Sequence, residues 1–303
     1  SHAHWIRTMI PRRPWIILAL LGGFLAPGCT SKTEPVSVSE PEPAPREVLD
    51  GPVYKVGVVP QWGTVRLFEI WQPLIVRLRQ ETGLNLKLEP VDSIPNFEKG
   101  FSEGAYDFAY MNPYHFVCAQ RDQGYLPLVR DYEKQLKGIL VASTESDIRE
   151  LDDLEGQPID FPSPNALGAS LYMRALLTRQ FGIEYEAKFV KTHESVYLNV
   201  ISGTAAAGGG VGRTLGAQQP EVRERLRVIY ETPGVAPHPI AYHPRVPAEA
   251  AERMKNAILT MSNTESGKEL LAGIPMVKPG EAVPEDYKPL IDLGLEEFYQ
   301  APQ

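Results

Sequence analysis

Short apolar strands alternate with amphipathic helices over most of this chain, and this alternation limits the possible folds more than any other feature. The first series predicts strands at residues 54–59, 84–91 and 107–111. Helices are predicted between these strands at residues 68–82 and 97–103, and Gly83 is placed to end the first helix as a C-cap. The order strand, helix, strand, helix, strand is typical of a mainly parallel sheet covered by helices.

A second alternating series predicts a second α/β lobe. Its strands are expected at residues 138–143, 158–161, 188–190, 205–211 and 228–230. Helices are expected after the turn 163–166 to about residue 181, and then at residues 195–202, 248–261, 266–271 and 287–298. The sequence therefore predicts a two-lobed α/β fold with a mainly parallel sheet flanked by helices in each lobe.

The division of the chain between the lobes follows from the two series. Residues 51–140 together with 232–303 are expected to form lobe I, and residues 141–231 to form lobe II. The chain would then cross between the lobes near Gly138 and again near Glu231, which predicts a hinge of two strands.

The N-terminal segment has the composition of an export signal. Arg12 and Arg13 precede an apolar run over residues 15–26, and Pro27-Gly28-Cys29 follows it. The stretch Leu25 to Cys29 resembles a lipobox, which implies a lipid on Cys29, although Ala26 stands where the commonest lipobox has leucine. An uncleaved membrane anchor is the alternative, but about 12 apolar residues are few for a bilayer that needs about 20.

The residues that flank this signal segment are not expected to fold. Residues 1–8 lie upstream of Met9, which is the more natural start, and residues 30–50 are rich in proline, serine and glutamate. A flexible tether between a lipid and a folded body is the interpretation. The expected location is the periplasm or cell envelope, with the protein held at a membrane by its N-terminal lipid.

Composition and motifs exclude several function classes. The net charge is −8 and there is no long basic run, so binding to nucleic acid is not expected. Cys118 is the only cysteine besides Cys29, which excludes a disulfide framework. His238 and His243 lie in a proline-rich stretch with no zinc-site spacing. No nucleophile–base pair is visible, so neither a metal, a cofactor nor an enzyme activity is predicted.

Four stretches together resemble a known family. They are residues 56–60, residues 107–114, residues 148–156 followed by 160–168, and Thr192-His193-Glu194. In order and spacing they are similar to the periplasmic substrate-binding proteins for phosphate, phosphite and phosphonates that serve ABC importers. The resemblance implies a two-lobed type II binding fold that captures a small oxyanion and delivers it to a membrane permease. A sensor that reports to a membrane kinase stays open as an alternative, and a periplasmic enzyme ranks below both; a monomer is expected.

Candidate ligand contacts follow from the residues and from the resemblance. The turn at 163–168 opens a helix, whose free backbone N–H groups can bind an oxyanion. His193 matches the family's ligand-contacting histidine, and a partly charged imidazole would titrate near neutral pH. Arg213, after a glycine run, offers a fork of donors to a carboxylate or phosphate. The predicted ligand-binding residues are Tyr110, Asn112, Tyr114, Ser163, Asn165, Ala166, Leu167, Gly168, His193 and Arg213.

Two departures from the family pattern leave the ligand open. Phosphonate binders have a serine-threonine-serine run at the helix start, where this chain has Ala166-Leu167-Gly168. The family also tends to have an acidic residue in the strand after the histidine-bearing helix, but residues 205–214 contain none. The predicted site therefore keeps backbone donors and lacks a carboxylate for an amine.

Overall fold

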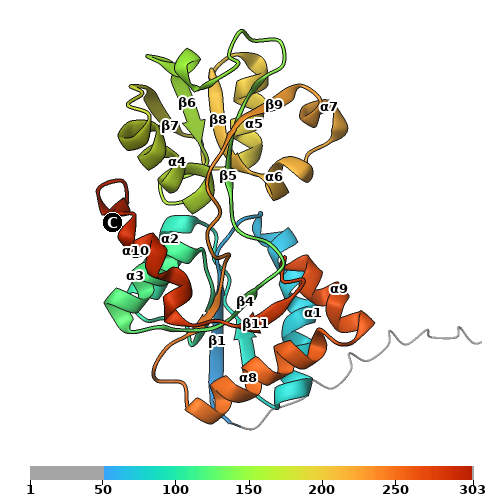
Figure 1. Cartoon of the computed structure of the whole chain (residues 1–303). Helices are drawn as coiled ribbons and strands as arrows, with labels where there is room; N and C mark the ends of the chain where they lie inside the picture. The colour runs from blue at the N-terminus through green and yellow to red at the C-terminus, as the bar shows by residue number, and fades with distance from the viewer. Residues whose placement is uncertain (1–50, 302–303) are drawn as a thin grey trace, which may run out of the picture. The chain divides into compact units, whose positions relative to one another are not determined.

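A computed structural model describes residues 51–301, which form two β-sheets with flanking helices (Figure 1). The predicted signal peptide, Cys29 and the tether lie outside the described residues. Among residues 51–301, no helix is both long and apolar enough to cross a bilayer.

The first sheet has six strands in the order β11-β4-β10-β3-β1-β2. Their bounds are β1 Val53–Val58, β2 Asn85–Leu88, β3 Phe108–Tyr110, β4 Leu126–Asp131, β10 Ile240–Tyr242 and β11 Pro279–Glu281. The associated helices are α1 Thr64–Thr82, α2 Ile94–Ser102, α3 Pro113–Gln123, α8 Ala248–Met261, α9 Glu265–Gly273 and α10 Lys288–Asp292. β1 pairs in parallel with both β2 and β3, as the strand–helix–strand order predicted.

The second sheet has five strands in the order β7-β6-β8-β5-β9. Their bounds are β5 Gly138–Ser143, β6 Pro158–Phe161, β7 Glu186–Phe189, β8 Ala207–Val211 and β9 Leu226–Glu231. A continuous helical stretch consists of a π-helical segment Leu167–Leu171, α4 Tyr172–Ala175 and a second π-helical segment Leu176–Gln180. The other helices are α5 His193–Ser202, α6 Gly212–Gly216 and α7 Pro220–Arg223, with a 3-10 turn at Leu151–Leu154.

Both sheets are mixed, but four strands in each, β1 to β4 and β6 to β9, run in the same direction, in agreement with the prediction of mainly parallel sheets. β10 runs antiparallel to β3 and β4, and β11 runs antiparallel to β4. In the second sheet, β5 is antiparallel to β8 and to β9. β5 and β10 each follow a passage of the chain between the sheets directly, without a helical crossover that would bring the chain back for a parallel strand.

The chain passes between the sheets after β4 and returns after β9. These two connecting segments pair with each other, because the backbone N–H of Leu136 donates to the carbonyl of Val235 at 2.8 Å and the reverse bond measures 3.0 Å. β5 begins at Gly138, so residues 138–140, which were expected in lobe I, pair within the second sheet.

Hydrophobic cores cover both faces of the second sheet. Leu140 belongs to a core with Met173 and Leu177, whereas its neighbours Ile139 and Val141 belong to a core with Val196 and other residues of α5. Alternate residues of one strand therefore bury opposite faces, as the pleat requires. The helical stretch 167–180 also contributes Leu171 and Tyr172 to the large core of the first sheet, so both sheets pack against this stretch.

The sequence predicted neither α3 nor the short helices α6 and α7, and it predicted one continuous helix where the structure has several short ones. α3 begins directly after Asn112, whose Oδ1 accepts a hydrogen bond from the backbone N–H of His115 at 2.8 Å, with Pro113 at its first position. Asparagine followed by proline is a typical helix start, but no helix was predicted at these residues. In place of the helix predicted at 287–298, the structure has a 3-10 turn at Pro284–Tyr287, then α10, and a second 3-10 turn at Leu295–Glu297. Gly294, in a left-handed conformation with a φ of 59°, separates α10 from this second turn.

Candidate functional site

Most of the predicted ligand contacts lie just beyond the carboxyl ends of strands in the two sheets. Tyr110 ends β3, Ser163 follows β6 by two residues and Arg213 follows β8 by two residues. In open α/β sheets this edge is where ligands bind, because loops and helix N-termini meet there. The fold therefore brings residues more than 100 positions apart in the sequence to one region.

Asn112 and Asn165 meet directly and join the two sheets. The side-chain amide of Asn112 donates to the backbone carbonyl of Asn165 at 3.1 Å. The Asn165 side chain exchanges two hydrogen bonds with the backbone of Gln300, at 2.7 and 2.9 Å. Both asparagines are buried, at 5% and 2% exposure, so their amide groups position the surrounding backbone rather than standing free.

A buried hydrogen-bonded pair, Glu98 and His115, supports Asn165 and was not predicted from the sequence. One carboxylate oxygen of Glu98 accepts from the Asn165 amide at 2.8 Å and lies 2.9 Å from Nε2 of His115. Glu98 is 2% exposed and His115 is fully buried between Phe97 and Phe101. A glutamate on the apolar face of α2 gave the only sequence signal, and nothing local indicated its partners.

The two predicted tyrosines have different environments. The hydroxyl of Tyr110 donates to the carbonyl of Ile274 at 3.3 Å, and its ring stacks on His238 with centroids 5.3 Å apart. Tyr114 lies inside α3 at 1% exposure and packs against Tyr299, so it is a core residue in this structure rather than part of a ligand loop. Burial raises the pKa of both phenols, which keeps them neutral.

The turn 163–168 provides unused donors at the start of a helix. The backbone N–H groups of Ser170 and Leu171 both donate to the carbonyl of Ala166, so the N–H groups of Leu167 and Gly168 precede the first intrahelical bond. The hydroxyl of Ser163 is buried and has no hydrogen-bond partner in the described part of the chain. Gly138 is required here, because a Cβ at that position would overlap the carbonyl oxygen of Gly168.

His193 is the first residue of α5 and lies against Thr214. Its Nδ1 is 3.1 Å from the Thr214 hydroxyl, which itself donates to the carbonyl of Val211 at 2.9 Å. Because a threonine hydroxyl has one proton, we assign the Nδ1 proton to His193, which leaves its Nε2 as an acceptor. Burial lowers the pKa of His193 to about 4, so the ring is neutral at pH 7 and does not titrate near neutral pH as the sequence suggested.

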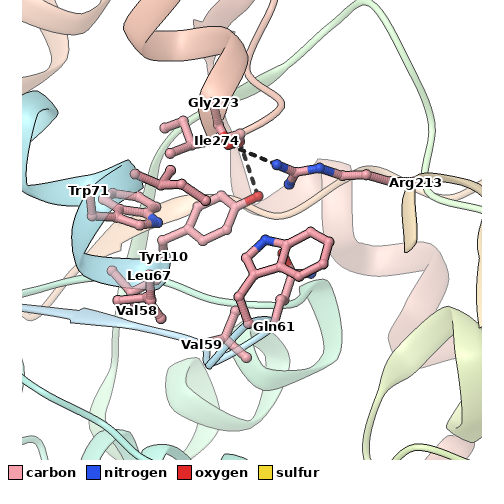
Figure 2. Close-up of a pocket in the computed structure, with 11 residues that line it drawn as sticks. Val58, Val59, Gln61, Leu67, Trp71, Tyr110, Arg213, Gly273 and Ile274 are labelled. Carbon is pink, nitrogen blue, oxygen red and sulfur yellow. Dashed lines mark hydrogen bonds between the residues drawn. The ribbon is translucent and has the colours of Figure 1, made fainter. Parts of the chain in front are cut away.

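Arg213 closes one side of a narrow cavity (Figure 2). Its guanidinium donates to the carbonyl of Gly273 at 2.7 Å, and the cavity below it has a volume of about 10 Å³. The lining residues are Val58, Val59, Gln61, Trp62, Leu67, Ile70, Trp71, Tyr110, Arg213, Gly273 and Ile274. A cavity of this size holds at most one water molecule, so a tetrahedral anion needs these side chains to separate.

His238 borders the same region. In the sequence this residue was weighed only as a metal ligand, and no metal site was predicted there. Its Nε2 lies 3.1 Å from the side-chain amide of Gln61, and its ring covers Tyr110. Burial, together with the nearby charges of His115 and Arg213, lowers the pKa of His238 to about 3. Within residues 51–301, no three His, Cys, Asp or Glu side chains gather in a way that would hold a metal ion.

The arrangement of the two sheets, with polar groups gathered at the strand ends, is that of the type II periplasmic binding proteins. Residues 56–287 match the model of the family described as "ABC transporter, phosphonate, periplasmic substrate-binding protein". The chain belongs to this family, whose members are binding proteins for transport rather than enzymes.

Solved structures agree with this fold. The binding protein component of a phosphonate ABC transporter from Pseudomonas aeruginosa has 16% identity and a TM-score of 0.73, over 82% of this chain and 88% of that one. PhnD1 from Prochlorococcus marinus, solved with methylphosphonate, has 19% identity and a TM-score of 0.73, over 81% and 98%. A Xanthomonas citri protein, solved with ATP, has 12% identity and a TM-score of 0.68, over 84% and 100%. At these identities the similarity concerns the fold.

Proposed function

We propose that this protein is an extracytoplasmic solute-binding lipoprotein that captures a small oxyanion of the phosphate, phosphite or phosphonate type and delivers it to an ABC permease. The observation that carries the proposal beyond the family is the turn 163–168. It combines a buried hydroxyl on Ser163, which has no hydrogen-bond partner among residues 51–301, with backbone N–H groups that precede the first bond of a helical stretch. Such donors bind tetrahedral anions without any need for a positive net charge.

His193 would act on the ligand in its neutral form. With Nδ1 donating to Thr214, its Nε2 presents a lone pair that can accept a proton from a ligand P–OH group. A singly protonated phosphate or phosphonate supplies that proton, whereas a fully ionised oxyanion would have to protonate the ring. This mode uses His193 and Ser163 together and does not need the hydroxyl run that the chain lacks at residues 166–168.

Ligand entry would require the two sheets to move apart. Several direct contacts hold this region together, among them the bond between Asn112 and the Asn165 carbonyl and the bond between Arg213 and the Gly273 carbonyl. The two connecting segments around Leu136 and Val235 are the covalent links between the sheets, so we propose them as the hinge. Lobe I would then comprise the first sheet and lobe II the second.

The N-terminal part of the proposal concerns the attachment of the protein. A lipid on Cys29 and a flexible tether over residues 30–50 would keep a monomeric binding protein near its permease while the two lobes open and close. Mass spectrometry of protein purified from membranes tests this point, since a diacylglyceryl group on Cys29 is expected. Recovery of an unmodified Cys29 would contradict it.

Calorimetric titration is the direct test of ligand class. We expect binding of at least one ligand among phosphate, phosphite and methylphosphonate, and none of sulfate, which carries no proton for Nε2 of His193 at neutral pH. A His193→Gln variant should weaken the interaction, while the exposed control Arg253→Gln should not. If none of the tetrahedral anions binds the protein, the proposed ligand class is wrong.

A further inference from the structure

Two guanidinium groups from different parts of the fold share one indole ring. The guanidinium carbon of Arg66, in the first turn of α1, lies 4.1 Å from the centre of the Trp62 ring. The guanidinium carbon of Arg213, in the first turn of α6, lies 5.7 Å from the same ring. Trp62 and Arg213 also line the cavity shown in Figure 2, together with Tyr110 and Trp71.

Neither arginine is neutralised by the protein. Within residues 51–301, Arg66 and Arg213 form no ion pair with an aspartate or glutamate, although Arg77, Arg121, Arg130, Arg179, Arg225 and Arg245 each do so. None of the described residues that line the cavity is acidic. Removal of water from around its guanidinium lowers the pKa of Arg213, and the charge of Arg66 lowers it further. Two uncompensated cations on one ring in a chain of net charge −8 indicate a place for an anion.

The region around Arg66, Arg213 and Trp62 is separate from the turn 163–168 but close to it. Tyr110 lines the cavity, and Asn112, two residues further along the chain, bonds to the carbonyl of Asn165 in the turn. Two residues of extended chain span about 7 Å, which is comparable with the length of a small molecule with an anionic group at each end. The carboxylate of Glu98, which contacts the turn through Asn165, is already engaged by His115 and Asn165 and so is not free to bind an amine.

We propose that Arg66 and Arg213 together bind a carboxylate at the far end of the ligand, so that the preferred ligands are phosphonates with a carboxylate tail. The proposal rests on the proposed function for the tetrahedral group and adds the chemistry of the remainder of the ligand. Each guanidinium offers a planar fork of donors that fits a carboxylate, and Trp62 holds both forks in place. An aminoalkyl phosphonate would bring its ammonium group to two positive charges.

Calorimetry with a graded set of ligands tests the proposal on the whole protein. Methylphosphonate serves as the reference, phosphonoacetate and 3-phosphonopropionate carry the carboxylate, and 2-aminoethylphosphonate carries the opposite charge. At least one carboxylated ligand should bind about tenfold or more tightly than methylphosphonate, since hydrogen bonds to charged groups are among the strongest in proteins. The aminoalkyl ligand should bind more weakly than methylphosphonate.

The variant Arg66→Gln separates this inference from the proposed function. It should abolish the advantage of the carboxylated ligands and leave the affinity for methylphosphonate within about twofold. Arg253→Gln, an exposed arginine of α8 that forms no ion pair in the described structure, is the matched control and should change neither affinity.

Each outcome bears on one of the two proposals. If methylphosphonate binds but the carboxylated ligands bind no more tightly, the arginine pair has no such role and the proposed function stands. If phosphate, phosphite and all phosphonates fail to bind but succinate binds in a manner that depends on Arg66, the proposed function is wrong and the carboxylate site is supported. If succinate and all of these tetrahedral anions fail to bind, both proposals are overturned.

Discussion

Replacement of Arg174 tests how the candidate site is held between the two sheets. Arg174 lies on α4 at 8% exposure, and its guanidinium donates to Ser170 Oγ at 3.1 Å. It also donates to the backbone carbonyls of Pro164 at 2.7 Å and Phe298 at 2.8 Å. One side chain therefore ties the turn 163–168 to the C-terminal segment of the described chain.

The expected loss of stability follows from these contacts. Arg174→Ala leaves the half-buried carbonyls of Pro164 and Phe298 without their donor, at about 1–2 kcal/mol for each group. It also removes the packing of the aliphatic part of the arginine side chain. The guanidinium carbon lies 5.3 Å from the ring centre of Phe189 and 5.8 Å from that of Phe298, and these contacts are lost too. Burial lowers the pKa of Arg174, which shows that the buried charge carries a desolvation cost that its removal recovers. The net destabilisation should be about 3 kcal/mol.

Arg179 provides the matched control from the same helical stretch. Its guanidinium also reaches the C-terminal segment, at the carbonyl of Gly294 and the carboxylate of Glu297, but its side chain is 41% exposed. Water replaces these contacts, so Arg179→Ala should cost about 1 kcal/mol or less.

Urea unfolding at pH 7, followed by circular dichroism, measures both variants. The midpoint should fall clearly for Arg174→Ala and little for Arg179→Ala, with unchanged slopes. Arg174→Lys should recover only part of the loss, because an ammonium group cannot donate to all three acceptors in one plane. Equal effects of the two alanine variants would refute the argument that burial makes Arg174 the structural link.

Three further predictions concern the second sheet. Thr214→Val removes the hydrogen-bond partner of His193 and of the buried Tyr197 hydroxyl, which lies 2.7 Å from the Thr214 hydroxyl. Thermal unfolding should show that the free energy of unfolding falls by about 1–3 kcal/mol. An unchanged stability would contradict the assigned hydrogen-bond network. Gly138→Ala places a methyl group against the Gly168 carbonyl and should cost about 1–3 kcal/mol, whereas the same change at the open Gly216 should be tolerated. The pKa of His193 is about 4 in the folded protein, against 6.5 for a free side chain, so the unfolded state binds more protons between these pH values. The free energy of unfolding should therefore fall as the pH drops from 6.5 to 4, and His193→Gln should make this fall shallower. An unchanged slope in the variant would count against the assigned pKa.

Parts of the candidate site could be read from the sequence because their signals are local. The turn 163–168 was recognised from its Ser-Pro-Asn composition before a helical pattern, and it provides the unused donors in the structure. The position of Arg213 after β8 followed from the glycine run. Tyr114 was predicted as a ligand contact because no helix was predicted after Asn112. In the structure this tyrosine lies inside α3 and is buried in the core.

Contacts across the fold could not be read in this way. Arg66 and Trp62 were not predicted as site residues, because an arginine and a tryptophan near the start of a helix carry no sequence signal for ligand binding. Their importance comes from Arg213, almost 150 positions later, which approaches the same ring. The role of Glu98 likewise follows only from its contacts with His115 and Asn165, which are distant in the sequence.

The sequence by itself determined the α/β class, the two series of strands and helices, and most element positions, including α8 at residues 248–261. These features depend on hydrophobic periodicity and capping, which act within a few residues of each other. The tertiary structure alone decided the direction of the strands beside the two crossings and the packing of one helical stretch against both cores. It also decided which charged groups face one another, because such pairings depend on long-range packing that no local pattern encodes.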